Sequence, residues 1–344
     1  SEQIIELMEQ GSTRGVKVMA FPELCLTAYT CSDLFLQESL LREAKKELKR
    51  ILQASKSKDM ILFVGMPGMH KGKLYNVAAV LNRGRILGIV PKKHLPNYSE
   101  FYELRHFNPG MEKVEMTDWE GVQVPMGMNL LFACRTMPEL VLAAELCEDV
   151  WVPCPPSISH ALAGATVIAN CSASDETTGK DQYRYNLICG QSARLVCGYI
   201  YANAGEGESS QDLVFGGQNI IAENGTCLVQ SDRFKNACIC ADLDLGRIIS
   251  ERRRMTTFRD EENRSASYET VYFELNTEDS AKKDSKKAGQ KRDELLRYID
   301  PAPFVPHDAG QRERRCEEIL SIQAMGLKKR LAHTNCKHAV IGLS

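Results

Sequence analysis

The sequence predicts an α/β sandwich with mixed β-sheets, and three observations support this fold class. Strand-like and helix-like segments alternate over the first 270 of the 344 residues. Two of the strands are joined by a tight hairpin, so the sheets are not the purely parallel ones of a doubly wound fold. Hydrophobic residues make up 43% and charged residues 26% of the chain, which is typical of a globular protein and excludes wholesale disorder.

The individual elements follow from the spacing of apolar residues. A helix is predicted around residues 4–8, and a buried strand over residues 15–21 that ends at Pro22. Apolar residues at helical spacing predict a helix over residues 36–54. The hairpin pairs strands at residues 75–81 and 85–90 through Asn82-Arg83-Gly84. The remaining predictions are strands at residues 60–64, 140–146, 165–169, 198–202, 218–222, 226–230 and 237–241, and a helix at residues 183–196.

The composition changes after about residue 275, which predicts a second part of the chain. Residues 276–310 are interpreted as a charged and Pro-rich linker, because acidic residues interleave with the basic ones. An amphipathic helix is predicted at residues 313–331, and the start of a buried strand at residues 339–342. Since this strand begins just before the last residue, we expect a fragment cut inside a second domain over residues 311–344. A start at Ser1 in an apparent helix interior suggests a matching cut at the other end.

Charge and cysteine usage exclude several classes of protein. The 43 Lys and Arg residues nearly balance the 45 Asp and Glu residues, so no one-signed field favours nucleic acid or a membrane surface. No apolar run approaches the roughly 20 residues of a membrane span. The 13 cysteines include no C-x-x-C pair, the 7 histidines lack metal-ligand spacing, and no metal site is predicted. Cys238 and Cys240 lie in a predicted strand, where both would point to the same face. Free, buried, reduced cysteines in a cytosolic protein are expected.

Polar side chains stand at the ends of three predicted strands. Glu23 follows the strand that Pro22 ends, and Lys92 follows the second strand of the hairpin. Cys147 ends the apolar run at residues 141–146 and is followed by two acids. Each has an ordinary alternative: an acid at a loop start, a solvated basic turn, or a small core residue. In open α/β sheets, however, the carboxyl ends of strands are where ligands bind.

Together these three residue types form a complete set for amide hydrolysis. Cysteine supplies an attacking thiolate, and glutamate takes the thiol proton, gives it to the departing ammonia and then activates water. Lysine stabilises the oxyanion and offsets the neighbouring acids, which would otherwise raise the pKa of the thiol. A Cys–His pair is the alternative, but His94, His106 and His160 have no distinctive context.

Three ordered motifs carry a family resemblance. The chain has Phe-Pro-Glu-Leu at residues 21–24, Lys-x-x-Leu-Pro-x-Tyr at residues 92–98 and Glu-x-Cys-Glu-Asp-x-Trp at residues 145–151. This order resembles the carbon–nitrogen hydrolase (nitrilase) superfamily. Residues 21–35 and 145–153 are more closely similar to the glutaminase domain of the glutamine-dependent NAD synthetase family, and the resemblance runs from residue 1 to 344.

The resemblance implies a four-layer αββα nitrilase-like sandwich over residues 1–275, without its first strand, and then the truncated start of an α/β synthetase domain. Residues 316–331 resemble the helix leading into that domain. Residues 340–344 resemble the strand before its pyrophosphate-binding loop, of which Ser344 would be the first residue.

The resemblance also implies roles for eight residues. The residues of the catalytic group are Glu23 as the base, Lys92 as the oxyanion-stabilising lysine, Cys147 as the nucleophile and Glu103 as a second acid beside the lysine. The residues of the substrate-binding group are Tyr98, Glu148, Ser174 and Lys180. Lys180 stands where the family often has Arg. A lysine ammonium can still bind a carboxylate, but it lacks the two parallel N–H donors of a guanidinium.

The implied activity is hydrolysis of glutamine to glutamate and ammonia through a thioester. Ammonia would serve the ATP-dependent amidation of deamido-NAD to NAD in a full-length, cytoplasmic, homo-oligomeric enzyme. The glutaminase part would need no cofactor, since ATP and Mg would bind outside this sequence, and its partners would be glutamine and the synthetase domain of the same chain. Two alternatives stay open: a stand-alone amidase acting on another small amide, and a catalytically silent module.

Overall fold

The computed structural model describes residues 1–119, 121–210, 212–258, 267–276, 295–340 and 342. The chain divides into two compact units, Ser1–Arg297 and Tyr298–Ser344. Most of the predicted linker, residues 277–294, lies outside the described residues, as do Ile341, Leu343 and Ser344.

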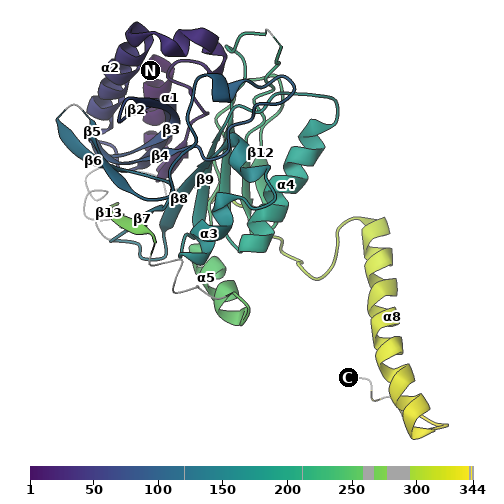
Figure 1. Cartoon of the computed structure of the whole chain (residues 1–344). Helices are drawn as coiled ribbons and strands as arrows, with labels where there is room; N and C mark the ends of the chain where they lie inside the picture. Colours follow the sequence, from purple (N-terminus) through teal and green to yellow (C-terminus); the bar gives the residue numbers. More distant parts are fainter. Residues whose placement is uncertain (120, 211, 259–266, 277–294, 341, 343–344) are drawn as a thin grey trace. The chain divides into compact units, whose positions relative to one another are not determined.

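Two mixed β-sheets packed face to face form the centre of the first unit (Figure 1). The first sheet has the order β1-β2-β3-β4-β6-β5. Its strands are β1 (Val18–Ala20), β2 (Ile61–His70), β3 (Lys73–Asn82), β4 (Arg85–Pro91), β5 (Glu115–Trp119) and β6 (Val122–Met126). The second sheet has the order β12-β11-β10-β9-β8-β7-β13. Its strands are β7 (Leu130–Cys134), β8 (Val141–Leu146), β9 (Val167–Ser172), β10 (Gly198–Asn203), β11 (Ile220–Glu223), β12 (Thr226–Gln230) and β13 (Glu269–Phe273).

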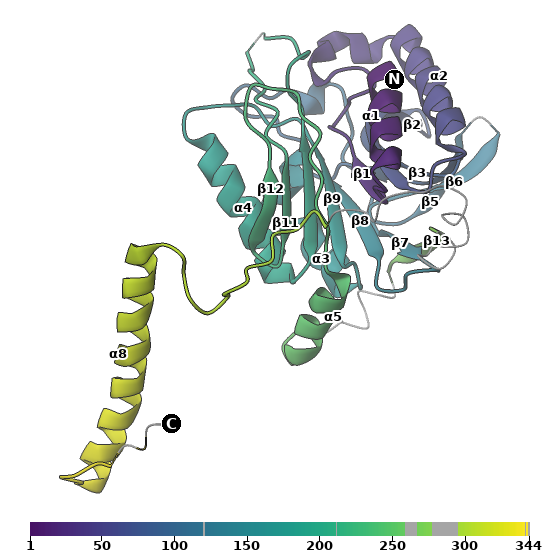
Figure 2. The same ribbon diagram turned by 180° about the vertical axis from the view of Figure 1, so that it is seen from behind.

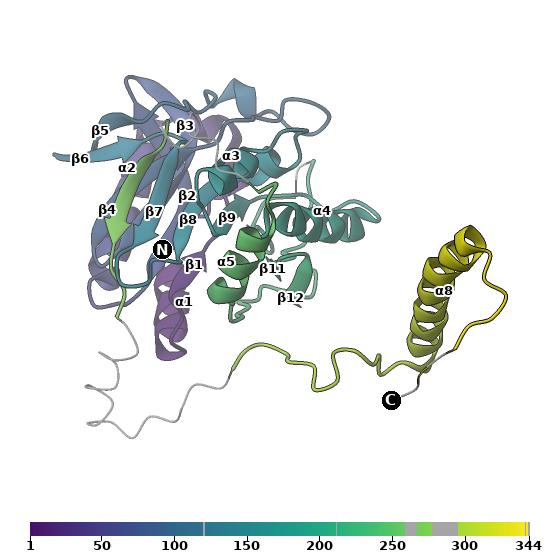
Figure 3. The same cartoon turned by 90° about the horizontal axis from the view of Figure 1, so that it is seen from below.

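Helices cover the outer face of each sheet. The first sheet is covered by α1 (Glu2–Thr13) and α2 (Glu38–Ser55). The second sheet is covered by α3 (Pro156–Leu162) and α4 (Lys180–Leu195), and α5 (Leu245–Arg254) follows β12. Figures 2 and 3 show the same separation from behind and from below, with α1 and α2 on one side and α3 and α4 on the other. The expected αββα arrangement of four layers is confirmed.

The strands of the first sheet are apolar without alternation because both of their faces are buried. In β2, Ile61 and Phe63 pack toward the second sheet, whereas Leu62 and Val64 pack toward the helices. The ring of Phe63 meets that of Phe132 of β7 edge to face at 6.2 Å. A strand buried on both faces reads as a continuous apolar run, which is why the sequence located these strands.

Most of the predicted elements are present at shifted bounds. The hairpin of β3 and β4 pairs Asn82 with Arg85, and Arg83 and Gly84 have φ angles of 47° and 77°, as a two-residue hairpin turn requires. The sequence missed β5, β6, β7, β13, α3 and α5. The pair β5 and β6 was missed because it ends the first sheet and each strand buries only some of its residues, so neither gives a continuous apolar run.

Two predictions in this unit are wrong. Residues 237–241 form no strand, since the carbonyl oxygen of Ala237 accepts from the Asn219 side chain at 2.9 Å instead of joining a ladder. The cysteines are all free, but they are not all buried. The exposed ones are Cys154 and Cys238 in this unit, and Cys316 and Cys336 in the second unit.

The second unit contains one long helix, α8 (Ala309–Thr334), which agrees with the predicted amphipathic helix. The Asp308 side chain accepts from the backbone N–H of Gln311 at 2.7 Å and caps its first turn. The buried strand expected after it is wrong for its first residues: Ala339 and Val340 are not in a strand, and Val340 is fully exposed. A strand needs a neighbouring strand for its backbone groups, and the described part of this unit offers none. Among the described helices, none is both long and apolar enough to cross a bilayer.

Candidate active site

A buried ionic cluster lies where the predicted strand ends meet. The Nζ atom of Lys92 is 2.6 Å from Oε1 of Glu23 and 2.6 Å from Oε1 of Glu103. Glu23 and Lys92 have no exposed surface, and Glu103 is 4% exposed. Three ionisable groups buried in contact require mutual pairing, because an isolated charge in a protein interior is strongly unfavourable.

Glu23 is fixed by hydrogen bonds to both sheets. Its Oε1 accepts from Nδ2 of Asn76 on β3 at 2.6 Å, and its Oε2 accepts from the backbone N–H of Ala173 after β9 at 3.0 Å. The turn that carries it lies directly on β2 at Gly65, where a Cβ atom would be 2.3 Å from the Pro22 carbonyl oxygen. A glycine is therefore needed in the neighbouring strand for Glu23 to reach this position.

The ionisation of the cluster follows from burial and pairing. Burial alone would lower the pKa of Lys92, but Glu103 and Glu23 outweigh it and hold this pKa well above its usual value. Burial and the charge of Glu23 raise the pKa of Glu103 to about 7, against the opposing attraction of Lys92. Lys92 is thus a permanent cation at the site.

Cys147 begins a 3-10 turn, η3 (Cys147–Val150), directly after β8. Its φ angle is 38°, in the left-handed region that non-glycine residues rarely adopt, and strained residues of this kind cluster at functional sites. Burial and the charge of Glu23 raise the pKa of its thiol, and Lys92 acts in the opposite direction. The thiol of Cys147 is therefore neutral at rest, and the charges of both Glu23 and Lys92 act on it.

A chain of buried hydrogen bonds holds the backbone of Cys147. Its N–H donates to Oδ1 of Asn170 at 3.1 Å. Asn170 in turn donates from Nδ2 to the Tyr199 hydroxyl at 3.1 Å, and that hydroxyl donates to Glu145. Glu145 also accepts from the backbone N–H of Ser157 at 2.8 Å. Since all these groups are buried, the network fixes the turn that presents the nucleophile.

Asp149 joins the turn that begins at Cys147 to the loop that follows Lys92, a role that the sequence prediction missed. One of its oxygens accepts from the backbone N–H of Leu146 at 3.1 Å, and the other accepts from the backbone N–H of His94 at 2.9 Å. The sequence marked Asp149 only as an acid beside Cys147. Its partner His94 lies 55 residues away in the chain, so no local pattern indicated this contact.

Two of the four predicted substrate-binding residues contact each other. The hydroxyl of Tyr98, whose side chain is half exposed, donates to Oε1 of Glu148 at 2.9 Å. Burial raises the pKa of Glu148, and the Tyr98 hydrogen bond opposes that shift. An acceptor carboxylate next to the nucleophile suits a ligand ammonium group.

The other two, Ser174 and Lys180, belong to the segment that leads from β9 into α4. Ser174 is buried, and its Oγ accepts from the guanidinium of Arg184 at 3.2 Å. Lys180 begins α4, forms an ion pair with Asp175, and places its ammonium 5.5 Å from the centre of the Trp151 ring. Arg184, which the sequence did not single out, has no exposed surface and supports Ser174 from behind.

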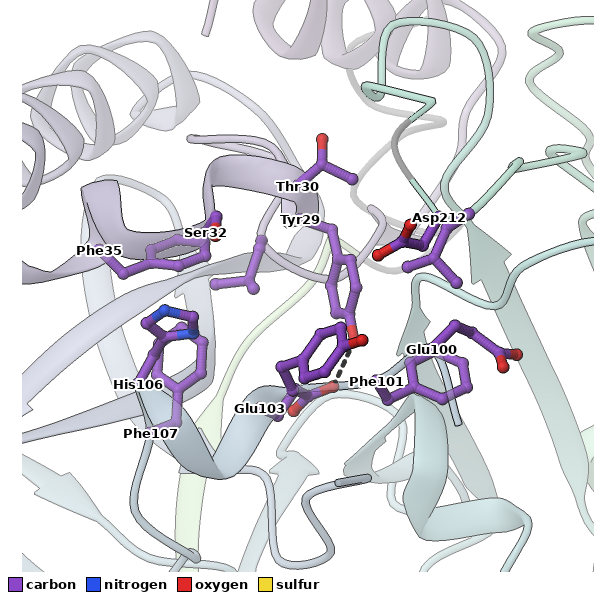
Figure 4. Close-up of a pocket in the computed structure, with 13 residues that line it drawn as sticks. Tyr29, Thr30, Ser32, Phe35, Glu100, Phe101, Glu103, His106, Phe107 and Asp212 are labelled. Atoms are coloured by element: carbon purple, nitrogen blue, oxygen red, sulfur yellow. Dashed lines mark hydrogen bonds between the residues drawn. The ribbon is translucent and has the colours of Figure 1, made fainter. Parts of the chain in front are cut away.

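A cavity of about 170 Å³ reaches this cluster through Glu103. Figure 4 shows the Tyr29 side chain pointing toward Glu103, with Glu100 and Asp212 together on one side of the pocket. The Tyr29 hydroxyl donates to Oε1 of Glu103 at 2.8 Å, the same oxygen that meets Lys92. A much larger groove lies between α1, β1 and β10, away from Cys147, so its size does not make it the catalytic site.

The three candidate histidines are engaged elsewhere. His94 pairs through Nδ1 with Asp149 at 2.9 Å, and His106 pairs through Nε2 with Asp33 at 2.9 Å. His160 is buried, and its Nδ1 lies 2.7 Å from the hydroxyl of Tyr268. The geometry thus favours Glu23 over a histidine as the base for Cys147.

The model of the carbon-nitrogen hydrolase family matches residues 2–253. The chain belongs to this family. It is also similar to the glutamine-dependent NAD(+) synthetase of Mycobacterium bovis, with 40% identity over 99% of this chain and 50% of the relative. The Aquifex aeolicus protein of the same name is 31% identical over 75% of this chain and 41% of the relative. The chain thus spans about half the length of the curated relatives that it matches most fully.

Solved structures agree with the fold. A glutamine-dependent NAD(+) synthetase from Cytophaga hutchinsonii has a TM-score of 0.61 and 29% identity, covering 68% of this chain and 38% of that one. An amidase from Nesterenkonia sp. AN1 has a TM-score of 0.55 and 19% identity, covering 74% of this chain and 87% of that one, and supports the fold alone. The resemblance to the synthetase family and the nitrilase-like fold are therefore confirmed.

Proposed function

We propose that this chain hydrolyses glutamine to glutamate and ammonia, with Glu23, Lys92 and Cys147 as the catalytic residues. The observation that carries the proposal is the buried Glu23–Lys92 ion pair, which acts electrostatically on the thiol of Cys147 in a chain similar to glutamine-dependent NAD(+) synthetases. An attacking thiol, a base and a fixed cation are the three elements that amide hydrolysis through a thioester requires.

The reaction proceeds by two additions to the amide carbon. Glu23 takes the proton of Cys147, and the sulfur forms a bond to the side-chain amide carbon of glutamine. Lys92 stabilises the oxyanion, the carbon–nitrogen bond breaks, and Glu23 returns the proton to the leaving ammonia. Glu23 then takes a proton from water, and the hydroxide adds to the thioester. The carbon–sulfur bond breaks to release glutamate, and Glu23 returns the proton to the sulfur, which restores the thiol.

The ammonium and carboxylate groups of glutamine bind to different residues of the site. Glu148, held by Tyr98, receives the ammonium group, and Ser174 contacts the amino acid portion. Lys180 meets the carboxylate and shares its charge with Asp175. Glu103 keeps Lys92 in place from the side opposite Glu23.

In a longer protein, the ammonia would serve the ATP-dependent amidation of deamido-NAD by a synthetase portion of the same chain. The proposal assigns ATP and Mg to that portion, so the steps above use neither. We also propose that this longer protein is cytoplasmic and forms a homo-oligomer.

The test compares Cys147→Ala with Cys154→Ala, a matched control that removes an exposed thiol seven residues later. We expect Cys147→Ala to abolish ammonia release from glutamine, and Cys154→Ala to retain it. Glutaminase activity in Cys147→Ala refutes the nucleophile assignment.

Substrate choice separates the alternatives. If acetamide is hydrolysed and glutamine is not, the chain is an amidase for another small amide. If an electrophilic glutamine analogue leaves no adduct on Cys147, the chain is a silent module.

A further inference from the structure

We propose that Glu208, in the loop between β10 and β11, is a positioning residue that holds the catalytic Lys92 in place. Glu208 acts through two intermediate side chains, those of Tyr29 and Glu103. The inference rests on the proposed function, because it assigns to Glu208 a part in placing the lysine that stabilises the oxyanion.

The carboxylate of Glu208 binds the start of the 3-10 segment η1 (Tyr29–Leu36). Its Oε1 accepts from the backbone N–H of Tyr29 at 2.8 Å, and its Oε2 accepts from the backbone N–H of Thr30 at 3.0 Å. The Thr30 hydroxyl donates to the same Oε2 at 2.7 Å. The first N–H groups of a helix have no partner within it, and Ala28 at the N-cap position has no side-chain acceptor for them. Glu208 therefore caps this segment from 179 residues away.

The backbone just before Tyr29 is strained and needs such support. Ala28 has a φ angle of 92° and a ψ angle of 149°, a combination close to the region that only glycine adopts readily. A conformation of this kind persists only where the surrounding contacts impose it. The Tyr29 ring also packs edge to face on Phe215, with the ring centres 5.8 Å apart. Since Phe215 and Glu208 belong to the same loop, this loop fixes both the backbone and the ring of Tyr29.

The Tyr29 hydroxyl transmits this position to the catalytic lysine. It donates to Oε1 of Glu103 at 2.8 Å, and the same oxygen lies 2.6 Å from Nζ of Lys92. Oε2 of Glu103 is buried and has no hydrogen-bond partner among the described residues. Without the Tyr29 hydroxyl, the contact with Lys92 alone would hold this carboxyl group, which would then be free to rotate. Lys92 would lose its fixed place between two acids.

The test measures ammonia release from glutamine by Glu208→Ala and Tyr29→Phe, separately and together. Each single variant removes a hydrogen bond that involves an ionised carboxylate, so we expect kcat to fall about tenfold, with little change in KM. Because both residues act along one path, the double variant should lose no more than the larger of the two single losses. Glu206→Ala is the matched control and should retain its activity. Glu206 is exposed on the same loop and contacts Asn236 through its backbone.

Alkylation of Cys147 by iodoacetamide supplies a readout that does not depend on turnover. Burial raises the pKa of this thiol and Lys92 opposes the rise, so displacement of the lysine leaves less thiolate at a given pH. Cys147 should therefore react more slowly in both single variants, measured by mass spectrometry with the exposed Cys154 as internal reference. Urea unfolding confirms that each variant is folded. Glu208→Gln keeps one acceptor oxygen and should lose less of both rates than Glu208→Ala.

The proposal is overturned if Glu208→Ala keeps the wild-type kcat and alkylation rate, if it changes KM alone, or if its loss multiplies with that of Tyr29→Phe. If the wild-type chain releases no ammonia from glutamine, the proposed function fails instead. The alkylation rate of Cys147 then decides by itself whether Glu208 positions Lys92.

Discussion

Gly65→Ala should inactivate the site without removing any catalytic group. The added Cβ would lie 2.3 Å from the Pro22 carbonyl oxygen, 2.5 Å from the Leu24 nitrogen and 2.7 Å from the Glu23 Cα atom. All three are backbone atoms, so no side-chain rotation relieves the contact. Ordinary van der Waals contact begins at 3.4 Å, so the turn that carries Glu23 must retreat by about 1 Å.

The expected loss follows from that displacement. A shift of about 1 Å in a catalytic group costs about a hundredfold in rate, which corresponds to about 3 kcal/mol in the activation free energy. The Glu23 carboxylate would also lose its alignment with Lys92 and with the backbone N–H of Ala173. We expect kcat for glutamine hydrolysis to fall about a hundredfold, because the base is displaced while the wall formed by Tyr98 and Glu148 is unchanged.

The assay measures ammonia release at saturating glutamine, with far-ultraviolet circular dichroism and thermal unfolding as checks on folding. Gly68→Ala is the matched control in the same strand, since its Cβ meets only the Val77 side chain, at 3.1 Å. We expect the control to keep most of its activity. A folded Gly65→Ala protein with nearly wild-type kcat would refute the placement of Glu23 as the base, and an equal loss in Gly68→Ala would refute the steric argument.

Two further predictions concern the network behind the nucleophile. Tyr199→Phe removes the hydroxyl between Asn170 and Glu145, and should lower the free energy of unfolding by about 1–3 kcal/mol. Urea unfolding measures this loss of stability. Steady-state kinetics should also show a lower kcat with little change in KM, and a change in KM alone would contradict a positioning role. Glu145→Gln tests the ionisation of this carboxyl group. Burial raises the pKa of Glu145 to about 7 in the folded protein, against about 4.5 in the unfolded chain. Its stabilising contribution is therefore fully present below pH 4.5 and is lost as the pH rises through about 7. Between pH 5 and 8.5 the free energy of unfolding of the wild type should fall by about 2–3 kcal/mol relative to that of the variant. Parallel pH profiles of the two proteins in urea unfolding would refute the raised pKa of Glu145.

The sequence singled out Glu23, Lys92 and Cys147 because each follows a strong local signal. Pro22 ends the strand before Glu23, the hairpin ends before Lys92, and an apolar run ends at Cys147. The three strands are not neighbours, since β2 and β3 lie between β1 and β4, and β8 belongs to the second sheet. The packing of the two sheets, which no local signal predicts, places Lys92 in contact with Glu23 and lets both charges act on Cys147. Glu103 has no such signal. It lies on a short 3-10 turn in the long connection between β4 and β5, where no periodicity guides a prediction, and only the family resemblance identified it.

The residues that orient the triad could not be predicted from local patterns. Asn76 and Asn170 occupy buried strand positions, and a buried amide indicates a hydrogen bond without indicating its partner. Their partners are set by the packing of the strands: Asn76 reaches Glu23 across 53 residues of sequence, and Asn170 reaches Cys147 across 23. The strand wrongly predicted at residues 237–241 fails for a related reason, since the Asn219 side chain competes for its backbone.

In the proposed mechanism, the buried cluster favours transfer of the thiol proton to Glu23 over its release to solvent. Lys92 remains cationic beside Glu23 and Glu103, and burial keeps the proton on the Cys147 thiol, so the resting cluster has a fixed net charge. Moving a proton from Cys147 to Glu23 leaves that net charge unchanged, whereas releasing it to water would leave an uncompensated negative charge in a buried site. Lys92 would then attract the thiolate of Cys147 in place of the carboxylate of Glu23, so the same cation stabilises the negative charge after the proton transfer. Fixing the cation between two acids thus allows the first proton transfer to occur without a change in the charge of the interior.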